Sequence, residues 1–284
     1  MNRPRPSYRN VFLTFARNSL VRDMMFRGNF LIEAISAPCW TLMNQLFYNL
    51  IFVYTDSIGQ GTGWGKYQFF VFFATTILVN SLVQAFFMRN FEEFSELIRT
   101  GNLDFALLKP IDTQFLISLH RVTWSAFANT FFGLGLLIYA TWQLSRTESA
   151  ADWSIGPGTV LLYIVYVLCG VGILYSLMLT LSSTSIWLGR NQTLYNFWFY
   201  ITNFSRYPME IYGGSFPGIA LRFVFSFAIP ILLAVNVPAR WMAQPFAPLN
   251  RIYALVAIVA VVLSLLGSRW VFKKALLSYR SASS

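Results

Sequence analysis

The feature that most constrains the fold of this chain is a series of long apolar stretches with almost no charged residues. The clearest, YALVAIVAVVLSLLG, lies within residues 251–271, and similar stretches occupy 31–53, 67–89, 121–143 and 158–187. A helix needs about 20 apolar residues to cross a bilayer core that is about 30 Å thick. These stretches therefore predict membrane-spanning helices.

The composition leads to the same class of protein. Hydrophobic residues make up 56% of the chain and charged residues only 11%, whereas soluble domains carry about 25% charged residues. The chain lacks the polar side chains that would cover a water-facing globule. We expect an all-α polytopic membrane protein in which residues 1–284 form a single transmembrane domain.

The basic residues indicate the orientation of the chain. Six arginines precede the first apolar stretch, and Lys273, Lys274 and Arg280 follow the last one. Positive charges that flank spans favour the cytoplasmic side, so we expect both termini in the cytoplasm. Because the basic residues do not gather on one stripe, the net charge of +10 does not make nucleic acid an expected partner.

Two further apolar stretches, 192–207 and 219–237, cannot both cross the membrane. If the N-terminus is inside, four spans return the chain to the cytoplasm at Arg190. Two more full crossings before the last span would then leave Lys273 outside, which the positive-inside rule disfavours. The chain is therefore expected to have six spans in total.

We expect 192–207 to be the fifth span and 216–240 to re-enter the membrane from outside. Pro230 lies in the middle of the second stretch and Pro238 at its end. Proline breaks a regular helix, and irregular backbone survives at membrane depth only where protein or a wet cavity surrounds it. In the alternative layout, 219–237 is the fifth span and 190–218 is cytoplasmic.

The region before the first span predicts an amphipathic helix over residues 7–29. Phe12, Phe15, Leu20 and Met24 can share a stripe from which the arginines are displaced. Such a helix would lie on the inner leaflet among membrane lipids. A basic flank without fixed structure is the alternative.

The stretch FEEFSELIRTGNLDFALLKPID, residues 91–112, holds five of the eleven acidic residues in the chain. We call residues 90–112 the acidic segment, and the order of spans places it in the cytoplasm. Apolar residues recur at helical spacing on one face, at Phe87, Phe91, Phe94 and Ile98. Acidic residues occupy another face. The pattern predicts a short helix that is acidic on one side and apolar on the other.

The end of this helix and the start of the next one have recognisable signals. Glu96 and Arg99 are spaced to form an ion pair, and Gly101 is placed for a left-handed cap. Pro110 disfavours helix at the residue before it. Asp112 or Thr113 can then cap a helix that leads into the third span.

The acidic face favours a protein partner. An anionic inner leaflet would repel these carboxylates, whereas a basic protein surface would attract them. A solvated face that keeps the loop soluble is the alternative interpretation.

The acidic segment resembles the cytoplasmic loop of type-2 ATP-binding-cassette (ABC) transporter permeases, in the bacterial branch that carries IRxGxLDxxLLxP. The matching residues here are Ile98, Arg99, Gly101, Leu103, Asp104, Leu107, Leu108 and Pro110. SRYPMEIY (205–212) and FAIPILLAVNVPA (227–239) resemble the same branch more weakly.

The resemblance implies a permease subunit of an exporter in the bacterial inner membrane. Two copies of a separate ATPase subunit would bind ATP and Mg, and a second permease, identical or a paralogue, would complete the membrane dimer. The acidic segment would be the coupling helix, supported at that junction by the N-terminal helix. The residues implied at the ATPase contact are Glu92, Glu93, Glu96, Arg99 and Asp104, with Gly101 and Pro110 shaping the loop.

The chain has no nucleotide-binding motif of its own. A phosphate cradle requires GxxxxGK[ST], and the glycines of 59–66 do not have that spacing. Cys39 and Cys169 do not have metal-ligand spacing. We therefore expect no cofactor, no metal site and no catalytic residue in this chain.

Polar residues within the spans are candidates for a substrate pathway or a dimer face. Asn80 and Gln84 lie one turn apart, and so do Ser176 and Thr180. The alternative function is an integral membrane enzyme that acts on lipid-linked substrates. His120 is the only histidine and lies beside Arg121 at a predicted span entry, which favours an interfacial residue over a catalytic base.

Overall fold

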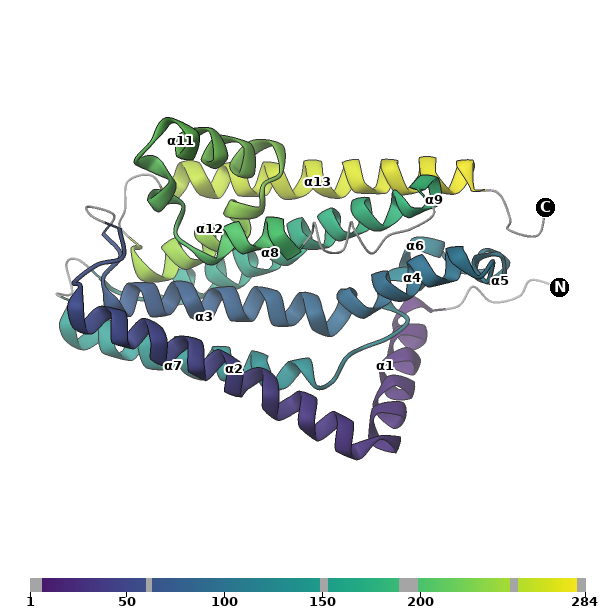
Figure 1. The fold of residues 1–284 in the computed structure, drawn as a ribbon, viewed down its shortest axis with the longest axis horizontal. Helices are drawn as coiled ribbons and strands as arrows, with labels where there is room; N and C mark the ends of the chain where they lie inside the picture. The colour runs from purple at the N-terminus through teal and green to yellow at the C-terminus, as the bar shows by residue number, and fades with distance from the viewer. Residues whose placement is uncertain (1–6, 60–62, 149–152, 189–198, 246–249, 280–284) are drawn as a thin grey trace.

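A computed structural model describes residues 7–59, 63–148, 153–188, 199–245 and 250–279, and that part of the chain is almost entirely helical (Figure 1). The longest helices run side by side along one axis. The first part of the chain forms α1 (Tyr8–Met25), α2 (Arg27–Tyr54), α3 (Lys66–Val83), a π-helical turn η1 (Gln84–Met88), α4 (Arg89–Arg99), α5 (Leu103–Leu107), α6 (Thr113–Leu119) and α7 (Ala126–Thr147). The second part forms α8 (Pro157–Ser183), α9 (Ser185–Leu188), the 3₁₀ turns η2 (Phe204–Arg206) and η3 (Met209–Gly213), α11 (Phe216–Phe223), the π-helical turn η4 (Val224–Ala228), α12 (Ile231–Ala243) and α13 (Asn250–Ser278). The predicted all-α class is confirmed for these residues.

The core of the bundle is built around α3 and α12. Helix α3 is apolar on all sides and contacts α7, α8 and α12. A helix of that kind is stable only where protein or lipid surrounds it. In α12, Ile231 to Ala239 are all buried, although the helix carries Pro238 in its interior.

Pro238 explains a close contact between α12 and α8. Proline has no N–H to donate to the carbonyl four residues earlier, which is that of Ala234. This carbonyl instead faces Gly170 of α8, where an added β-carbon would overlap the Ala234 oxygen and lie 3.0 Å from its carbonyl carbon. Gly170 therefore allows the two backbones to meet, and α12 continues through Pro238 to Ala243.

Gly170→Ala is expected to destabilise the chain by about 2 kcal/mol or more, because overpacking against a fixed backbone costs that much. Gly135→Ala on α7 is the matched control, since no atom lies within 4 Å of its added β-carbon. Thermal unfolding of both variants in the same detergent provides the measurement. Equal midpoints for the two variants would contradict the role given to Gly170.

Within the part of the chain that the structure describes, three helices are long and apolar enough to span a membrane by length and composition alone. They cover Lys66–Arg99, Pro157–Leu188 and Asn250–Ser278. If the bent helix pair Phe216–Ala228 and Ile231–Ala243 counts as one span, these residues hold four candidate spans. Helices α2 and α7 coincide with the stretches expected at 31–53 and 121–143 but do not meet that criterion. The stretch 192–207 lies partly outside the described residues, which are helical at 199–203 and 3₁₀ at 204–206.

The segment 216–240, which the sequence predicts to be irregular, is sharply bent. Its two helices meet at an angle of 90°. Pro230 occupies the N-cap of α12, so the break falls where proline interrupts backbone hydrogen bonding.

The two ends of the bundle differ in what they carry. Helices α4, α5, α6 and α9 lie at one end, together with α1 and the last turns of α13 (Figure 1). At the opposite end, the Gln244 amide donates to the Gly63 carbonyl over 2.7 Å. There the Trp153 indole donates to the Met242 carbonyl over 3.0 Å. Hydrogen bonds between loops thus close the end that lies away from the acidic segment.

Helix α1 lies across the end of the bundle and is held there by polar groups (Figure 1). The Ser19 hydroxyl accepts from the Val122 N–H over 3.1 Å, and the Ala16 carbonyl accepts from the Trp124 indole over 3.1 Å. Leu20 and Met24 are exposed. The predicted helix is therefore present, with Phe12 and Phe15 half-buried against the bundle. That its apolar stripe lies on the inner leaflet stays a prediction.

Candidate functional site

The acidic segment begins with a helix that has one buried face. In α4, Phe91 and Phe94 are buried, and the Phe94 ring lies 6.1 Å from that of Phe272 on α13. Glu92 and Glu96 are exposed. The spacing of apolar and acidic residues therefore does what the sequence predicts, since it anchors the helix by one face and leaves carboxylates on the other.

The turn after α4 is built on a glycine. Gly101 has a φ of 73°, in the left-handed region that disfavours side chains. The chain then forms α5, in which Leu103 and Ala106 are buried. Phe105 and Leu108 instead point outward and are 69% and 81% exposed.

Three contacts fasten the end of the acidic segment and the start of α6, which follows it. The Asp112 carboxylate caps α6 by accepting from the Phe115 N–H over 3.0 Å, and it lies 3.5 Å from the Arg269 guanidinium on α13. On α6, Gln114 donates to the Tyr175 hydroxyl of α8 over 2.9 Å. The loop is thereby tied to two long helices.

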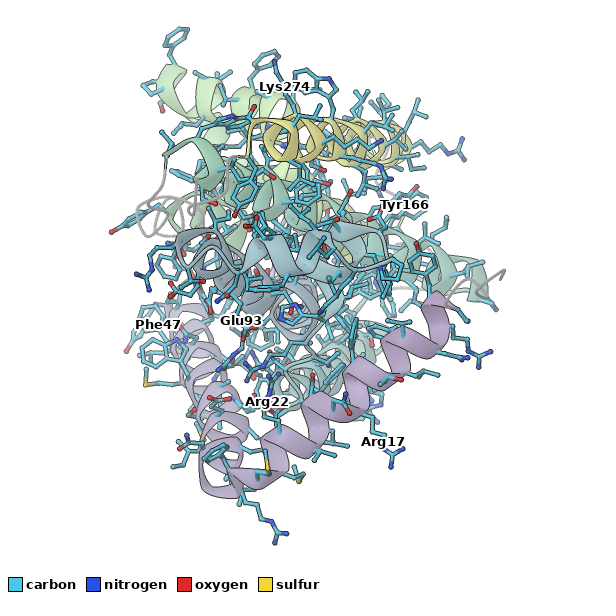
Figure 2. All side chains as sticks on the ribbon, turned by 90° about the vertical axis from the view of Figure 1, so that its right-hand side faces the viewer. Arg17, Arg22, Phe47, Glu93, Tyr166 and Lys274 are labelled. Carbon is cyan, nitrogen blue, oxygen red and sulfur yellow. The ribbon has the colours of Figure 1, made fainter. Side chains whose placement is uncertain are left out.

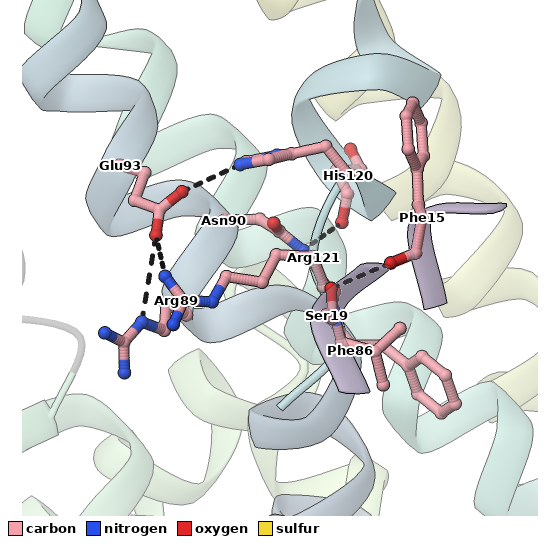
Figure 3. A network of polar contacts seen from close by, with 10 residues as sticks. Phe15, Ser19, Phe86, Arg89, Asn90, Glu93, His120 and Arg121 are labelled. Atoms are coloured by element: carbon pink, nitrogen blue, oxygen red, sulfur yellow. Dashed lines mark hydrogen bonds and ion pairs between the residues drawn. The ribbon is translucent and has the colours of Figure 1, made fainter. Parts of the chain in front are cut away.

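Glu93 faces inward and joins α4 to the connection between α6 and α7 (Figure 3). Its carboxylate lies 2.8 Å from His120 Nε2 and accepts from Arg121 Nη1 over 2.6 Å, and Arg89 Nε is 3.7 Å away. Burial alone would raise the pKa of Glu93, but the hydrogen bonds from His120 and Arg121 outweigh it and lower the pKa to about 2. The group is therefore ionised at neutral pH and acts as a structural link, because its two oxygens already have partners inside the chain.

Asn90 completes this link one turn earlier. Its buried amide donates to the carbonyls of Phe86, Ser118 and Arg121 over 2.6, 2.9 and 2.8 Å. One side chain thus satisfies backbone carbonyls of two separate segments, which would otherwise be costly to bury. The sequence contained no signal for Asn90, since its partners lie 28 and 31 residues away.

The other residues implied at an ATPase contact differ in their exposure and in their partners. Arg99 pairs with Glu96 on the exposed face, with a distance of 2.9 Å between Nε and Oε2, as their spacing predicts. Asp104 lies beside Tyr279, whose pKa is raised first by burial and then by the Asp104 charge. Pro110 is exposed after α5.

The sequence reasoning missed Phe105 and Leu108 as surface residues. In NLDFALL they indicate only a second apolar turn. An exposed apolar pair next to exposed carboxylates is typical of a protein interface rather than of a solvated loop.

The polar residues considered for a pathway mostly bond to their own helices. Ser176 and Thr180 each donate to the carbonyl four residues earlier, over 2.8 Å in both cases. Asn80 donates to the Thr76 carbonyl over 2.8 Å, and Gln84 is exposed in η1. These contacts explain how the polar groups are tolerated in a span, and they do not bring the four residues together as one site.

Comparison with known proteins adds one finding. The model of a family described as ABC-2 family transporter protein matches residues 39–283. No match was found among curated proteins or among solved structures.

Proposed function

The chain belongs to the ABC-2 transporter family, a family of multi-pass permease subunits that work with an ABC ATPase, and we propose that it is the permease of an exporter in the bacterial inner membrane. It pairs with a second permease, identical or a paralogue, and with two ATPase subunits that bind ATP and Mg. The export direction comes from the resemblance of the acidic segment to its bacterial branch.

One observation carries this proposal, the exposed surface of α4 and α5. We call Glu92, Glu96, Phe105 and Leu108 the coupling surface. All four side chains are exposed, and they combine two carboxylates with two large apolar groups. A partner groove with basic residues at its rim and an apolar floor would complement both kinds of group.

The contacts around the coupling surface support a lever mechanism. Helix α4 continues from α3 through η1, and α3 contacts α7, α8 and α12. Glu93 fastens the same segment to the connection before α7, and Asp112 fastens it to α6 and α13. ATP-driven closure of the ATPase pair would push the coupling surface and bias the packed helices toward one of two arrangements.

The proposed topology has six spans, with 192–207 as the fifth and 216–240 re-entering from outside. The Trp64 indole donates to the Glu210 carboxylate over 2.8 Å, so the start of this region meets the loop before α3. That contact favours the re-entrant layout over the one that keeps 190–218 beside the acidic segment. Asn80, Gln84, Ser176 and Thr180 remain proposed pathway or dimer residues.

Cysteine labelling tests the proposed orientation. In a Cys39→Ser, Cys169→Ala background, a membrane-impermeant maleimide should label Asp56→Cys in intact cells. It should label Leu108→Cys only after permeabilisation, because both native side chains are exposed and lie at opposite ends of the bundle. The reverse pattern would contradict both the orientation and the cytoplasmic coupling surface.

Co-purification tests the proposed function itself. The tagged permease is co-expressed with an ABC ATPase of the same bacterium, taken from a neighbouring gene where one encodes it. The permease should retain that ATPase through detergent extraction and stimulate its ATP hydrolysis. An ABC ATPase from an unrelated transporter is the control. A dedicated partnership would be contradicted if the permease retained neither ATPase, or if it retained both in equal amounts.

A further inference from the structure

A charged cavity of about 190 Å³ lies at the elbow between α1 and α2. Arg22 and Asp23 line it from α1 and Glu33 from α2, while Arg89 of α4 and Arg121 close the far side. The coupling surface does not include any of these residues. The cavity is therefore a feature that the lever mechanism leaves unexplained.

Two arginines that line this cavity have N–H groups without a hydrogen-bond partner in the described residues. Arg22 forms no ion pair within the described part of the chain, and the Nε atoms of Arg22 and Arg121 are buried without a hydrogen-bond partner there. Burial and the nearby Arg121 charge lower the pKa of Arg22. Buried donors without partners are rare and indicate an absent water, ion or ligand.

The acidic groups of the cavity are also without a cationic partner. The Asp23 carboxylate accepts from the Trp124 N–H over 3.4 Å, and the Glu33 carboxylate accepts from the Ser125 hydroxyl over 3.0 Å. Both donors are neutral. In the described residues, no ion pair joins either acid to the arginines across the cavity, so the lining presents separate positive and negative sites.

The surroundings place the cavity at the depth of lipid head groups. Phe26 and Phe30 form part of its wall, and Leu31 and Ile32 on the next turn of α2 are exposed apolar residues. Below them α2 continues as an apolar helix, while α1 above carries arginines. This change from basic to apolar surface is typical of a membrane interface.

We propose that this cavity binds the head group of a phospholipid that carries both a phosphate and a primary amine. The phosphate lies against Arg22 and Arg121, since guanidinium groups suit phosphate oxygens. The ammonium lies between Asp23 and Glu33. This inference requires the membrane placement of the family but not the ATPase coupling, so the two proposals can fail separately.

Native mass spectrometry of the full chain tests the site. Delipidated protein in detergent would be titrated separately with phosphatidylethanolamine, phosphatidylglycerol and phosphatidylcholine. Wild type should retain one phosphatidylethanolamine, and Arg22→Gln should weaken this binding at least about tenfold through the loss of charged hydrogen bonds. Arg17→Gln is the matched control, because Arg17 lies on the same helix but points away from the bundle, whereas Arg22 lies on the side that faces Glu93 (Figure 2).

Further measurements test the ammonium contact and the requirement for a lipid separately. The double variant Asp23→Asn, Glu33→Gln should lose the preference for phosphatidylethanolamine over phosphatidylglycerol. Phosphatidylcholine should bind weakly to wild type, because its quaternary amine cannot donate hydrogen bonds. Free phosphoethanolamine at equal concentration should not displace the lipid. Displacement by it, or equal retention by Arg22→Gln and Arg17→Gln, would overturn the proposal. If Arg22→Gln does not elute as a monodisperse protein, Arg22→Lys replaces it, with the expected loss still exceeding that of Arg17→Lys.

Discussion

Replacement of both Phe105 and Leu108 by aspartate is expected to reduce permease-stimulated ATP hydrolysis by more than about tenfold, the scale on which interface hot spots act. The two side chains are 69% and 81% exposed, so the chain itself gains little from them and should still fold. In the proposed complex, the same positions would enter an apolar groove, where an unpaired carboxylate is costly to desolvate.

The measurement is permease-stimulated ATPase activity in proteoliposomes, together with recovery of the ATPase on the tagged permease. Leu277→Asp is the matched control, because Leu277 is 89% exposed at the same end of the bundle but lies on α13, outside the coupling surface. Wild-type stimulation in the double variant would refute the role of the coupling surface. An equal loss in Leu277→Asp would show that any added charge at this end is harmful.

The features that the sequence predicted are those that depend on near neighbours. The left-handed Gly101, the Asp112 cap and the Glu96 to Arg99 pair each involve residues no more than three positions apart. The long apolar stretches likewise predicted helices close to their observed bounds. In each case the physical cause is local, because backbone strain, capping and membrane thickness act within one element.

The features that could not be predicted depend on distant parts of the chain. Glu93 is a glutamate like Glu92 and Glu96, yet it faces inward because it bonds to His120 and Arg121. These partners lie 27 and 28 residues later in the sequence. Helix α5 has only five residues, too few for a periodicity that would separate exposed Phe105 from buried Leu103. Gly170 is needed because the Ala234 carbonyl of another helix, four residues before Pro238, packs against it.

The buried ion pair at the opposite end of the bundle shows the same dependence on tertiary structure. The Arg240 guanidinium of α12 lies 2.9 Å from the Glu210 carboxylate, and the two side chains are only 11% and 16% exposed. The Trp64 indole bonds to the same carboxylate, so one acid joins the loop before α3, the turn η3 and α12. Nothing in the spacing of these three residues indicates that they meet.

Arg240→Ala is therefore expected to destabilise the chain by about 3–5 kcal/mol, because it leaves the Glu210 charge buried without its partner. Arg240→Met with Glu210→Leu should recover most of this loss, since an apolar pair of similar volume carries no charge to desolvate. Equilibrium unfolding in mixed micelles measures both effects, with Arg222→Ala as the control, because Arg222 forms one hydrogen bond to the neutral Tyr253 hydroxyl over 2.9 Å. If the double variant were as unstable as Arg240→Ala, the loss would come from packing rather than from the unpaired charge. The end of the bundle opposite the acidic segment would then not depend on this ion pair.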